Sequence, residues 1–355
     1  ALSAMRSPPF GALESVARHC TLPPLPATLR TTSETSASAA SAPAAAPAVN
    51  TVPGMPPVPN PKNVYSETGA EKISSALKDD LERIYVPNLR SGDVYVVDPA
   101  AMKVIDRFKV GIGPQHIVPS WDLRTLWVTN NAEGRTDGSL TPIDPKTGKP
   151  GKPVMVDDPY NMYATPDGKS AIVVAEARKR LDFRDPRTMA MQYSIDVPGC
   201  PGINHADFSI DGRFAIFTCE FSGTIAKIDL AERKVLGYLK LQMPSTRFKE
   251  KPGAPRSKPG QVWEPGETEV CTVDKGMPQD IRISPDGKRF YIADMHADGV
   301  HVVDGASFKQ VGFIPVNLTY LDGGQAEDGL LGLAIDPAFA ANGWLYLFYS
   351  KAGAE

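Results

Sequence analysis

An all-β fold built from a repeated unit is predicted by three features of this 355-residue sequence. Short runs rich in Val, Ile, Phe, Tyr and Thr alternate with turn sequences such as SPDG, and no helical periodicity lies between them. The pattern returns at intervals of about 44 residues. Four antiparallel strands in a repeat of this length are typical of a β-propeller blade, so we predict a β-propeller with five recognisable blades and a partial sixth.

The first element, residues 1–62, differs in composition from the rest of the chain. It consists largely of Ala, Ser, Thr and Pro and offers little to bury. Such a segment cannot offset its ordering entropy by burial, so we predict a disordered leader. It begins with Ala and shows no basic start followed by an apolar run, so no secretory signal peptide is visible in it.

The repeated units follow one order of strands. An inner strand ends at a tight turn, a strongly apolar second strand returns, a third strand ends in a motif such as VVDP, and a fourth alternates in polarity. Asp-Gly in the turn is a strong hairpin signal because Gly readily adopts positive φ. The second strands are predicted at residues 83–88, 125–130, 170–176, 214–220 and 289–294.

The second strands also carry a family signature. YVPN, WVTN and YIAD stand at the same position of different units, and SPDGKRFYIAD surrounds the last of them. Over residues 82–316 the sequence resembles the YVTN-type β-propeller repeat. The resemblance implies a propeller domain, which we set at residues 63–316, and it implies a periplasmic or secreted protein. It indicates little about function, because this class of propeller includes proteins of varied function.

The end of the chain has a different pattern. The stretch GGQAEDGLLGLAIDPAFAANGWLYLFYS (residues 323–350) resembles the first blade of the glucose/sorbosone dehydrogenase family, whose members are six-bladed quinoproteins that use pyrroloquinoline quinone (PQQ). We assign residues 317–355 to a partial blade of this kind. Either LLGLAIDP closes a five-bladed ring, or the chain is a truncated piece, and the leftover strand WLYLFYS favours truncation. PQQ and calcium are implied only if the resemblance reflects a longer protein.

The repeat predicts a set of side chains at one mouth of a central channel. Inner strands start, and second strands end, on the same face of a propeller. Alignment on the turns places four residues at the starts of inner strands: His116, Asn161, His205 and Asp280. It places five at the ends of second strands, with His296 shortly after: Asn88, Asn130, Glu176, Glu220 and Asp294.

Two kinds of binding are predicted there. Imidazole and carboxylate groups suit a divalent transition metal, for which we predict these ligands: His116, His205, Asp280, Asp294 and His296. A small molecule or protein partner is predicted to contact a second set: Asn161, Glu176, Arg178, Arg180 and Glu220. The competing interpretation is that the strand-end residues only cap turns and the histidines only complete local hydrogen bonds.

A basic segment and a long connection are further candidates. In EARKRLDFRDP the arginines either bind an anion through bidentate hydrogen bonds of their guanidinium groups or form ion pairs with Asp182 and Asp185. The connection of residues 243–276 is much longer than the others, and its Trp263 is a candidate lid or partner contact. The four cysteines lack CxxC spacing, so free thiols and a disulfide between two of Cys200, Cys219 and Cys271 both remain open.

Composition excludes several classes. A net charge of -3 offers no basic face for nucleic acid, and no apolar run is long enough for a transmembrane segment. No P-loop, GxSxG or HExxH motif occurs. We therefore favour an extracytoplasmic propeller that binds a ligand, metal or protein partner and is not catalytic as it stands. The alternatives are a fragment of a PQQ-dependent sugar or alcohol dehydrogenase, which would be a quinoprotein oxidoreductase, and a metal-binding redox propeller.

Overall fold

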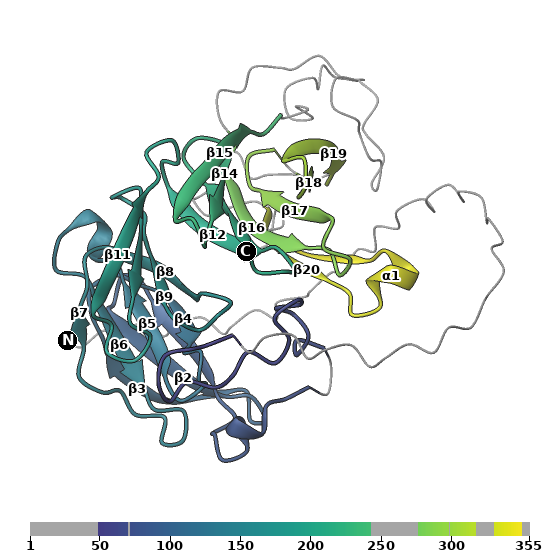
Figure 1. The fold of residues 1–355 in the computed structure, drawn as a ribbon. Helices are drawn as coiled ribbons and strands as arrows, with labels where there is room; N and C mark the ends of the chain where they lie inside the picture. The colour runs from purple at the N-terminus through teal and green to yellow at the C-terminus, as the bar shows by residue number, and fades with distance from the viewer. Residues whose placement is uncertain (1–48, 70–71, 243–275, 298, 317–329, 350–355) are drawn as a thin grey trace, which may run out of the picture.

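The structure is a computed structural model, and it describes residues 49–69, 72–242, 276–297, 299–316 and 330–349. The described strands form six antiparallel sheets, which we number as blades 1 to 6 along the chain. Blades 2 to 5 have four strands each, blade 1 has three and blade 6 has two. The all-β propeller fold predicted from the repeat is therefore confirmed (Figure 1). No helix in these ranges has the length and apolar character needed to cross a membrane.

The elements lie in the predicted order. Blade 1 contains β1 (Ile84–Asn88), β2 (Asp93–Asp98) and β3 (Lys103–Lys109), preceded by the short helix η1 (Ser75–Leu77). Blade 2 contains β4 (Pro114–Pro119), β5 (Leu126–Asn130), β6 (Ser139–Ile143) and β7 (Val154–Met155), with η2 (Ala132–Gly134) after β5. Blade 3 contains β8 (Pro159–Ala164), β9 (Ala171–Ala175), β10 (Arg180–Arg184) and β11 (Met191–Asp196).

The second half of the ring repeats this plan. Blade 4 contains β12 (Ile203–Phe208), β13 (Phe214–Cys219), β14 (Thr224–Asp229) and β15 (Lys234–Lys240). Blade 5 contains β16 (Pro278–Ile283), β17 (Arg289–Asp294), β18 (Gly299–Asp304) and β19 (Lys309–Pro315). Blade 6 contains β20 (Leu330–Ile335) and β21 (Leu345–Tyr349), joined across α1 (Phe339–Asn342).

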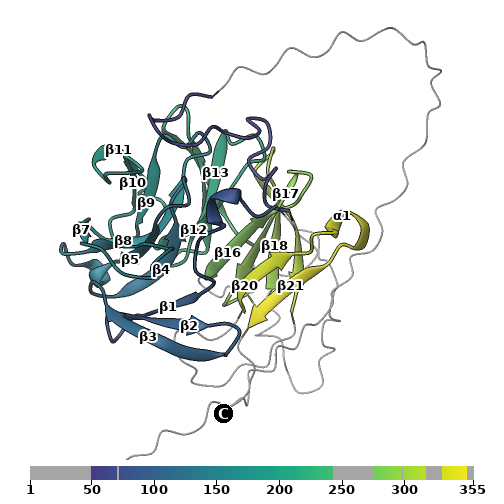
Figure 2. The same ribbon diagram turned by 90° about the horizontal axis from the view of Figure 1, so that it is seen from below.

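The innermost strands of successive blades are neighbours. β4 contacts β8, β8 contacts β12, β12 contacts β16, and β16 contacts β20. The blades therefore stand around a common centre (Figure 2). β20 pairs with β21 and not with β1, so the five-bladed closure by LLGLAIDP does not occur within the described strands.

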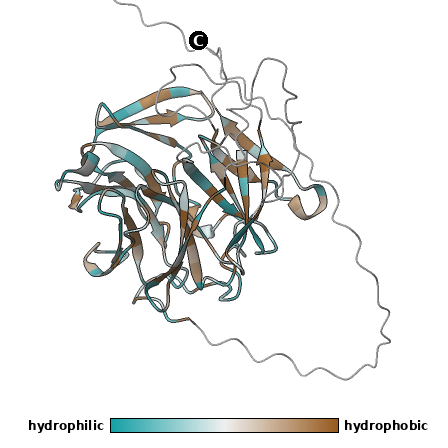
Figure 3. Ribbon diagram, turned by 90° about the horizontal axis from the view of Figure 1, so that it is seen from above, coloured by the Kyte–Doolittle hydropathy of each residue, from teal (hydrophilic) through white to brown (hydrophobic). Residues whose placement is uncertain are grey.

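Apolar side chains pack between neighbouring blades. The second strands β9, β13 and β17 are buried almost throughout, because each is covered on both faces by adjacent blades. Trp127, Phe217 and Tyr291 are at most 6% exposed and belong to three of these interblade clusters. Hydrophobic residues run along many of the strands (Figure 3).

The segment before blade 1 differs from the prediction. Residues 49–62, assigned to the leader by composition, contact the propeller, while residues 1–48 lie outside the described residues. The Trp121 indole donates to the carbonyl of Pro56 at 3.4 Å, and the Arg187 guanidinium donates to the carbonyl of Gly54 at 2.9 Å. These contacts use backbone carbonyls of the segment, which composition does not reveal.

Candidate functional site

A β-bulge lies at the start of the inner strand in each four-stranded blade. The register against the second strand shifts within the first four residues of β4, β8, β12 and β16. The third residues of these strands are the four predicted ones: His116, Asn161, His205 and Asp280. Bulges re-aim side chains and are frequent beside functional sites. The sequence alignment of the inner strands is thus reproduced at equivalent positions.

Two of these residues meet across the intervening blade. The imidazole rings of His116 in blade 2 and His205 in blade 4 have centroids 5.3 Å apart. The ring of Tyr160, from β8 between them, lies 5.1 Å from His116 and 6.3 Å from His205. Because β8 separates β4 from β12, the rings meet on the side of β8 that faces the propeller axis. The hydroxyl of Tyr163 accepts from the Asn161 amide at 3.0 Å. We call His116, Tyr160, Asn161, Tyr163 and His205 the axial cluster.

Threonines of the second strands hold the bulges in place. The Thr129 hydroxyl accepts from the backbone N–H of His116 at 3.0 Å and donates to the carbonyl of Tyr160 in the next blade at 2.8 Å. The Thr218 hydroxyl likewise accepts from the backbone N–H of His205 at 3.2 Å and donates to the carbonyl of Gln279 at 2.9 Å. Sequence reasoning missed both threonines, although each stands at the same position of its unit, in WVTN and FTCE.

Hydrogen bonds select a different tautomer for each histidine. Nδ1 of His116 lies 2.9 Å from the carbonyl oxygen of Tyr160, which can only accept, so this nitrogen carries the proton. Asn161 Oδ1 accepts from the N–H of Met162 at 2.7 Å, so its amide nitrogen faces Nδ1 of His205 at 3.4 Å. Nδ1 of His205 is therefore an acceptor, and its proton lies on Nε2.

Burial keeps both imidazoles neutral. The pKa of His205 falls to about 3, mainly because burial disfavours the cation and also because of the charges of His116 and Arg282. Burial also lowers the pKa of His116, opposed by the hydrogen bond to the Tyr160 carbonyl. Protonation of these rings, which an ordinary histidine undergoes near pH 6, is thereby displaced to more acidic pH.

A charged pair lies next to the axial cluster. Asp280 accepts from the Arg282 guanidinium at 2.5 Å and from the backbone N–H of Leu333 in blade 6 at 3.2 Å. Burial raises the pKa of Asp280, and Arg282 opposes this shift. The Asp280 carboxylate is thus occupied by its own blade and by blade 6.

Tyr65 reaches the opposite end of the same inner strands. Its hydroxyl contacts the carboxylate of Asp207 and accepts from the N–H of Phe208 at 2.9 Å. The second oxygen of Asp207 accepts from the N–H of Ile283 in blade 5 at 2.7 Å. Burial, followed by the charge of Asp207, raises the pKa of Tyr65. Residue 65 therefore ties the N-terminal segment to blade 4 through a protonated phenol.

The predicted strand-end residues do not share one register. Asn130 and Asp294 pair with the first residues of β4 and β16, but the equivalent positions in blades 3 and 4 are Ala175 and Cys219. Glu176 and Glu220 follow one residue later. The sequence alignment matched the strand ends by residue type. Counted in residues from the aspartate of each turn, the equivalent positions are instead Asn130, Ala175, Cys219 and Asp294.

Asn130 and Asp294 face the blade interior. The Asn130 amide donates to the carbonyl of Ser139 at 3.0 Å, and Asn88 similarly contacts backbone carbonyls of its own blade. Asp294 is fully buried, accepts from three backbone N–H groups and lies 3.2 Å from Nε2 of the buried His301. The competing interpretation, that strand-end residues cap turns, therefore holds for Asp294, which accepts from the N–H groups of His296 and Ala297. The amide groups of Asn88 and Asn130 instead donate to carbonyl oxygens of their own blades.

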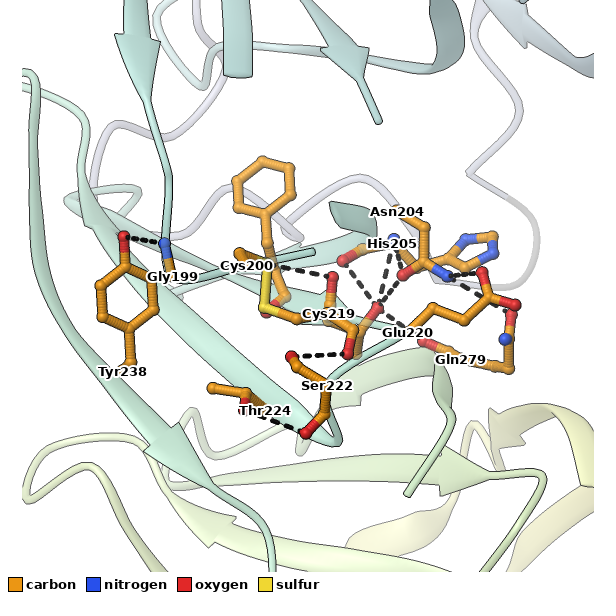
Figure 4. The surroundings of a disulfide bond; sticks show 12 residues. Gly199, Cys200, Asn204, His205, Cys219, Glu220, Ser222, Thr224, Tyr238 and Gln279 are labelled. Atoms are coloured by element: carbon orange, nitrogen blue, oxygen red, sulfur yellow. Dashed lines mark hydrogen bonds between the residues drawn. A yellow bond between two sulfur atoms is a disulfide. The ribbon is translucent and has the colours of Figure 1, made fainter. Parts of the chain in front are cut away.

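The disulfide joins Cys200 to Cys219, which settles the choice left open by the sequence; Cys20 and Cys271 lie outside the described residues. Figure 4 shows Asn204, Glu220 and Gln279 grouped beside it, next to His205. The Asn204 amide donates to Glu220 at 3.1 Å and to Gln279 at 3.5 Å. All three are less than 10% exposed. Glu220 thus belongs to a buried network that supports the start of β12.

The predicted anion site of blade 3 is occupied by internal ion pairs. Arg178 contacts the carboxylate of Asp157 with nitrogen–oxygen distances down to 3.0 Å. Arg180 contacts Asp182 at 2.6 Å, and Asp182 is fully buried. Hydrogen bonding to these carboxylates raises the pKa of both arginines. Pairing with Asp182 was one of the two alternatives, whereas the partnership with Asp157 was not expected.

The predicted metal ligands are not brought together as a set. His116 and His205 meet, but Asp280 is paired with Arg282, Asp294 points into its blade, and His296 is exposed. Within the described ranges no group of three His, Cys, Asp or Glu side chains is placed to hold a metal ion. The long connection with Trp263 lies outside those ranges.

Comparisons with known proteins establish the fold. No protein-family description matches the sequence, and no curated protein matches it. Hydrazine synthase of Kuenenia stuttgartiensis is similar in structure, with 19% identity, a TM-score of 0.52, and coverage of 76% of this chain and 71% of that chain. The similarity shows the β-propeller fold alone.

Two further solved structures are similar to this chain to a lesser degree. The periplasmic gluconolactonase PpgL of Pseudomonas aeruginosa has 18% identity and a TM-score of 0.49, with 72% of each chain covered. Dihydro-heme d1 dehydrogenase NirN has 16% identity and a TM-score of 0.44, with coverage of 76% of this chain and 52% of that chain. Neither assigns a site or an activity here.

Proposed function

We propose that this chain is an extracytoplasmic β-propeller that binds a small polar molecule at the axial cluster. The observation that supports this most strongly is the meeting of His116 and His205 across blade 3, with ring centroids 5.3 Å apart. Within the described residues, Nε2 of neither ring has a hydrogen-bond partner. Convergent polar groups at the centre of a propeller, with other bonding positions satisfied, are the arrangement expected of a ligand site.

The disulfide supports the proposed location. Structural disulfides persist in oxidising compartments such as the periplasm and are rare in the cytosol. The bond between Cys200 and Cys219 is fully buried beside the axial cluster. The YVTN-type resemblance points to the same compartment. Cell fractionation of the native host, with alkylation of free thiols before lysis, would test this: recovery of the protein in the cytosolic fraction with reduced cysteines would contradict it.

The binding function is tested by a ligand screen that compares three proteins. Saturation-transfer NMR of a library of small polar metabolites is recorded with the parent, with His205→Ala and with His296→Ala. We expect compounds whose signal is present in the parent and in His296→Ala but lost in His205→Ala. Because His296 is exposed and outside the axial cluster, its replacement is the matched control. If no compound depends on His205, the proposed function is wrong.

A further inference from the structure

We infer that the axial cluster recognises an uncharged hydroxyl group, which would donate its proton to Nε2 of His116 and accept one from Nε2 of His205. The inference rests on the proposed function and names the class of ligand: a small neutral alcohol or polyol. It follows from the opposite tautomers of the two rings, from the paired state of the surrounding charges, and from the spacing of the rings.

The tautomers make the two free nitrogens complementary. The Tyr160 carbonyl fixes the proton of His116 on Nδ1, which leaves a lone pair on Nε2. The orientation of Asn161, set by the N–H of Met162, fixes the proton of His205 on Nε2. One acceptor and one donor thus stand on two rings whose centroids are 5.3 Å apart. A hydroxyl is the common ligand group that uses both through a single atom.

The same assignment disfavours other ligands. A metal ion would need a lone pair from both rings, whereas the free nitrogen of His205 carries a proton. A carboxylate offers no proton to Nε2 of His116, and an ammonium offers no acceptor to Nε2 of His205. Only a group that both donates and accepts satisfies the pair without a change of tautomer.

The nearby charges are already compensated. Arg282 and Asp280 form an ion pair at 2.5 Å, and the charge of Arg282 reaches His205. Asp207 is occupied by Tyr65 and by backbone N–H groups of blades 4 and 5. A ligand with net charge would have to disturb one of these pairs and lose its hydration, which is costly in a partly buried site. A neutral ligand avoids both costs.

The two imidazole rings lie close enough together for one ligand to contact both. Hydrogen bonds from nitrogen to oxygen measure about 2.7–3.2 Å, so two nitrogens that share one oxygen lie within about 6.4 Å of each other. The two ring centroids are 5.3 Å apart, and the planes cross at 76°. The Tyr160 ring makes a T-shaped contact with each imidazole, so an aromatic surface adjoins both histidines.

The first experiment reads the tautomers directly. Long-range proton–nitrogen NMR of the ¹⁵N-labelled parent at neutral pH distinguishes protonated from unprotonated ring nitrogens, and His116→Phe and His205→Phe assign the signals. We expect His116 protonated at Nδ1 and His205 at Nε2. Identical tautomers for the two rings, or a cationic ring, would overturn the inference even if the ligand screen succeeds.

The second experiment titrates the labelled protein with matched probes. Erythritol is uncharged, and erythronate is the acid of the same carbon chain. We expect erythritol to shift the Nε2 signals of both histidines and to bind at least about tenfold more tightly than erythronate, or about 1.4 kcal/mol. His205→Phe should abolish binding of erythritol, and His296→Phe should leave it unchanged. Absence of erythritol binding, or tighter binding of erythronate, refutes the hydroxyl assignment.

The two proposals fail in different ways. If the screen finds ligands that depend on His205 but all are charged, the site stands and the hydroxyl inference falls. If no compound in the screen, erythritol included, depends on His205, both fall. Zinc titration supplies a further arm: coordination of zinc by both rings would overturn the tautomer assignment on which the inference rests.

Discussion

Replacing His205 by Gln should remove a pH dependence from the stability of the propeller. The pKa of this histidine is about 3 in the folded protein, against an ordinary value of 6.5. Because the folded pKa is depressed, the unfolded chain binds the proton more readily, and stability is lost as the pH falls below 6.5. Between pH 7 and pH 5 this lowered pKa decreases the unfolding free energy of the parent protein by about 2 kcal/mol. Glutamine does not titrate, so the variant should lack this loss.

The measurement is urea unfolding of parent and variant, followed by circular dichroism at pH 7, 6 and 5. The titration of all other groups is common to both proteins and cancels in the difference between their unfolding free energies. We expect that difference to change by about 2 kcal/mol in favour of the variant between pH 7 and pH 5. His116→Gln should behave in the same direction, since burial also lowers the pKa of His116. Parallel pH profiles for parent and His205→Gln would refute the claim that this ring is held neutral.

Three further predictions concern stability. Replacing Cys200 and Cys219 together by Ser should lower the unfolding free energy by about 3 kcal/mol, the loop-closure value for cysteines 19 residues apart, and unchanged urea midpoints would contradict the disulfide. Tyr65→Phe removes the hydroxyl group that contacts buried Asp207 and should cost about 1–3 kcal/mol in the same assay. If its midpoint matches that of the parent, the N-terminal segment is not anchored there. Trp127→Ala should cost about 3–5 kcal/mol, because this side chain is 6% exposed between blades, and a loss below 1 kcal/mol would contradict that placement.

The sequence predicted the inner-strand residues of the candidate site correctly, but not the residues at the ends of the second strands. The inner strands were aligned correctly because each begins at a constant distance before a turn of the Asp-Gly type, so the third residues fall into register. The ends of the second strands were matched by residue type, and Glu176 and Glu220 were therefore placed one position off. Counting from the turn aspartate would have placed Asn130 at the same position as Cys219, a residue type that is more often buried than a ligand-binding one.

Other features depend on contacts that leave no local pattern. Asp157 and Arg178 lie 21 residues apart on different strand connections, and their pairing depends on how blade 3 folds back on itself. The segment that contains Pro56 contacts the propeller through backbone carbonyls, which every residue possesses. Composition therefore assigned residues 49–62 to the leader although they lie against blades 2 and 3.

The sequence by itself determined the repeated four-stranded unit, the order of its strands, and the identity of the residue at the third position of each inner strand. These follow from periodicity and turn chemistry, which act over a few residues. Only the tertiary structure decided that His116 and His205 meet, because their contact depends on the curvature that brings β4 and β12 together on the axial side of β8. It also decided their protonation, since burial and the single hydrogen bond at each Nδ1 fix charge and tautomer, and neither is encoded near the histidine in the chain.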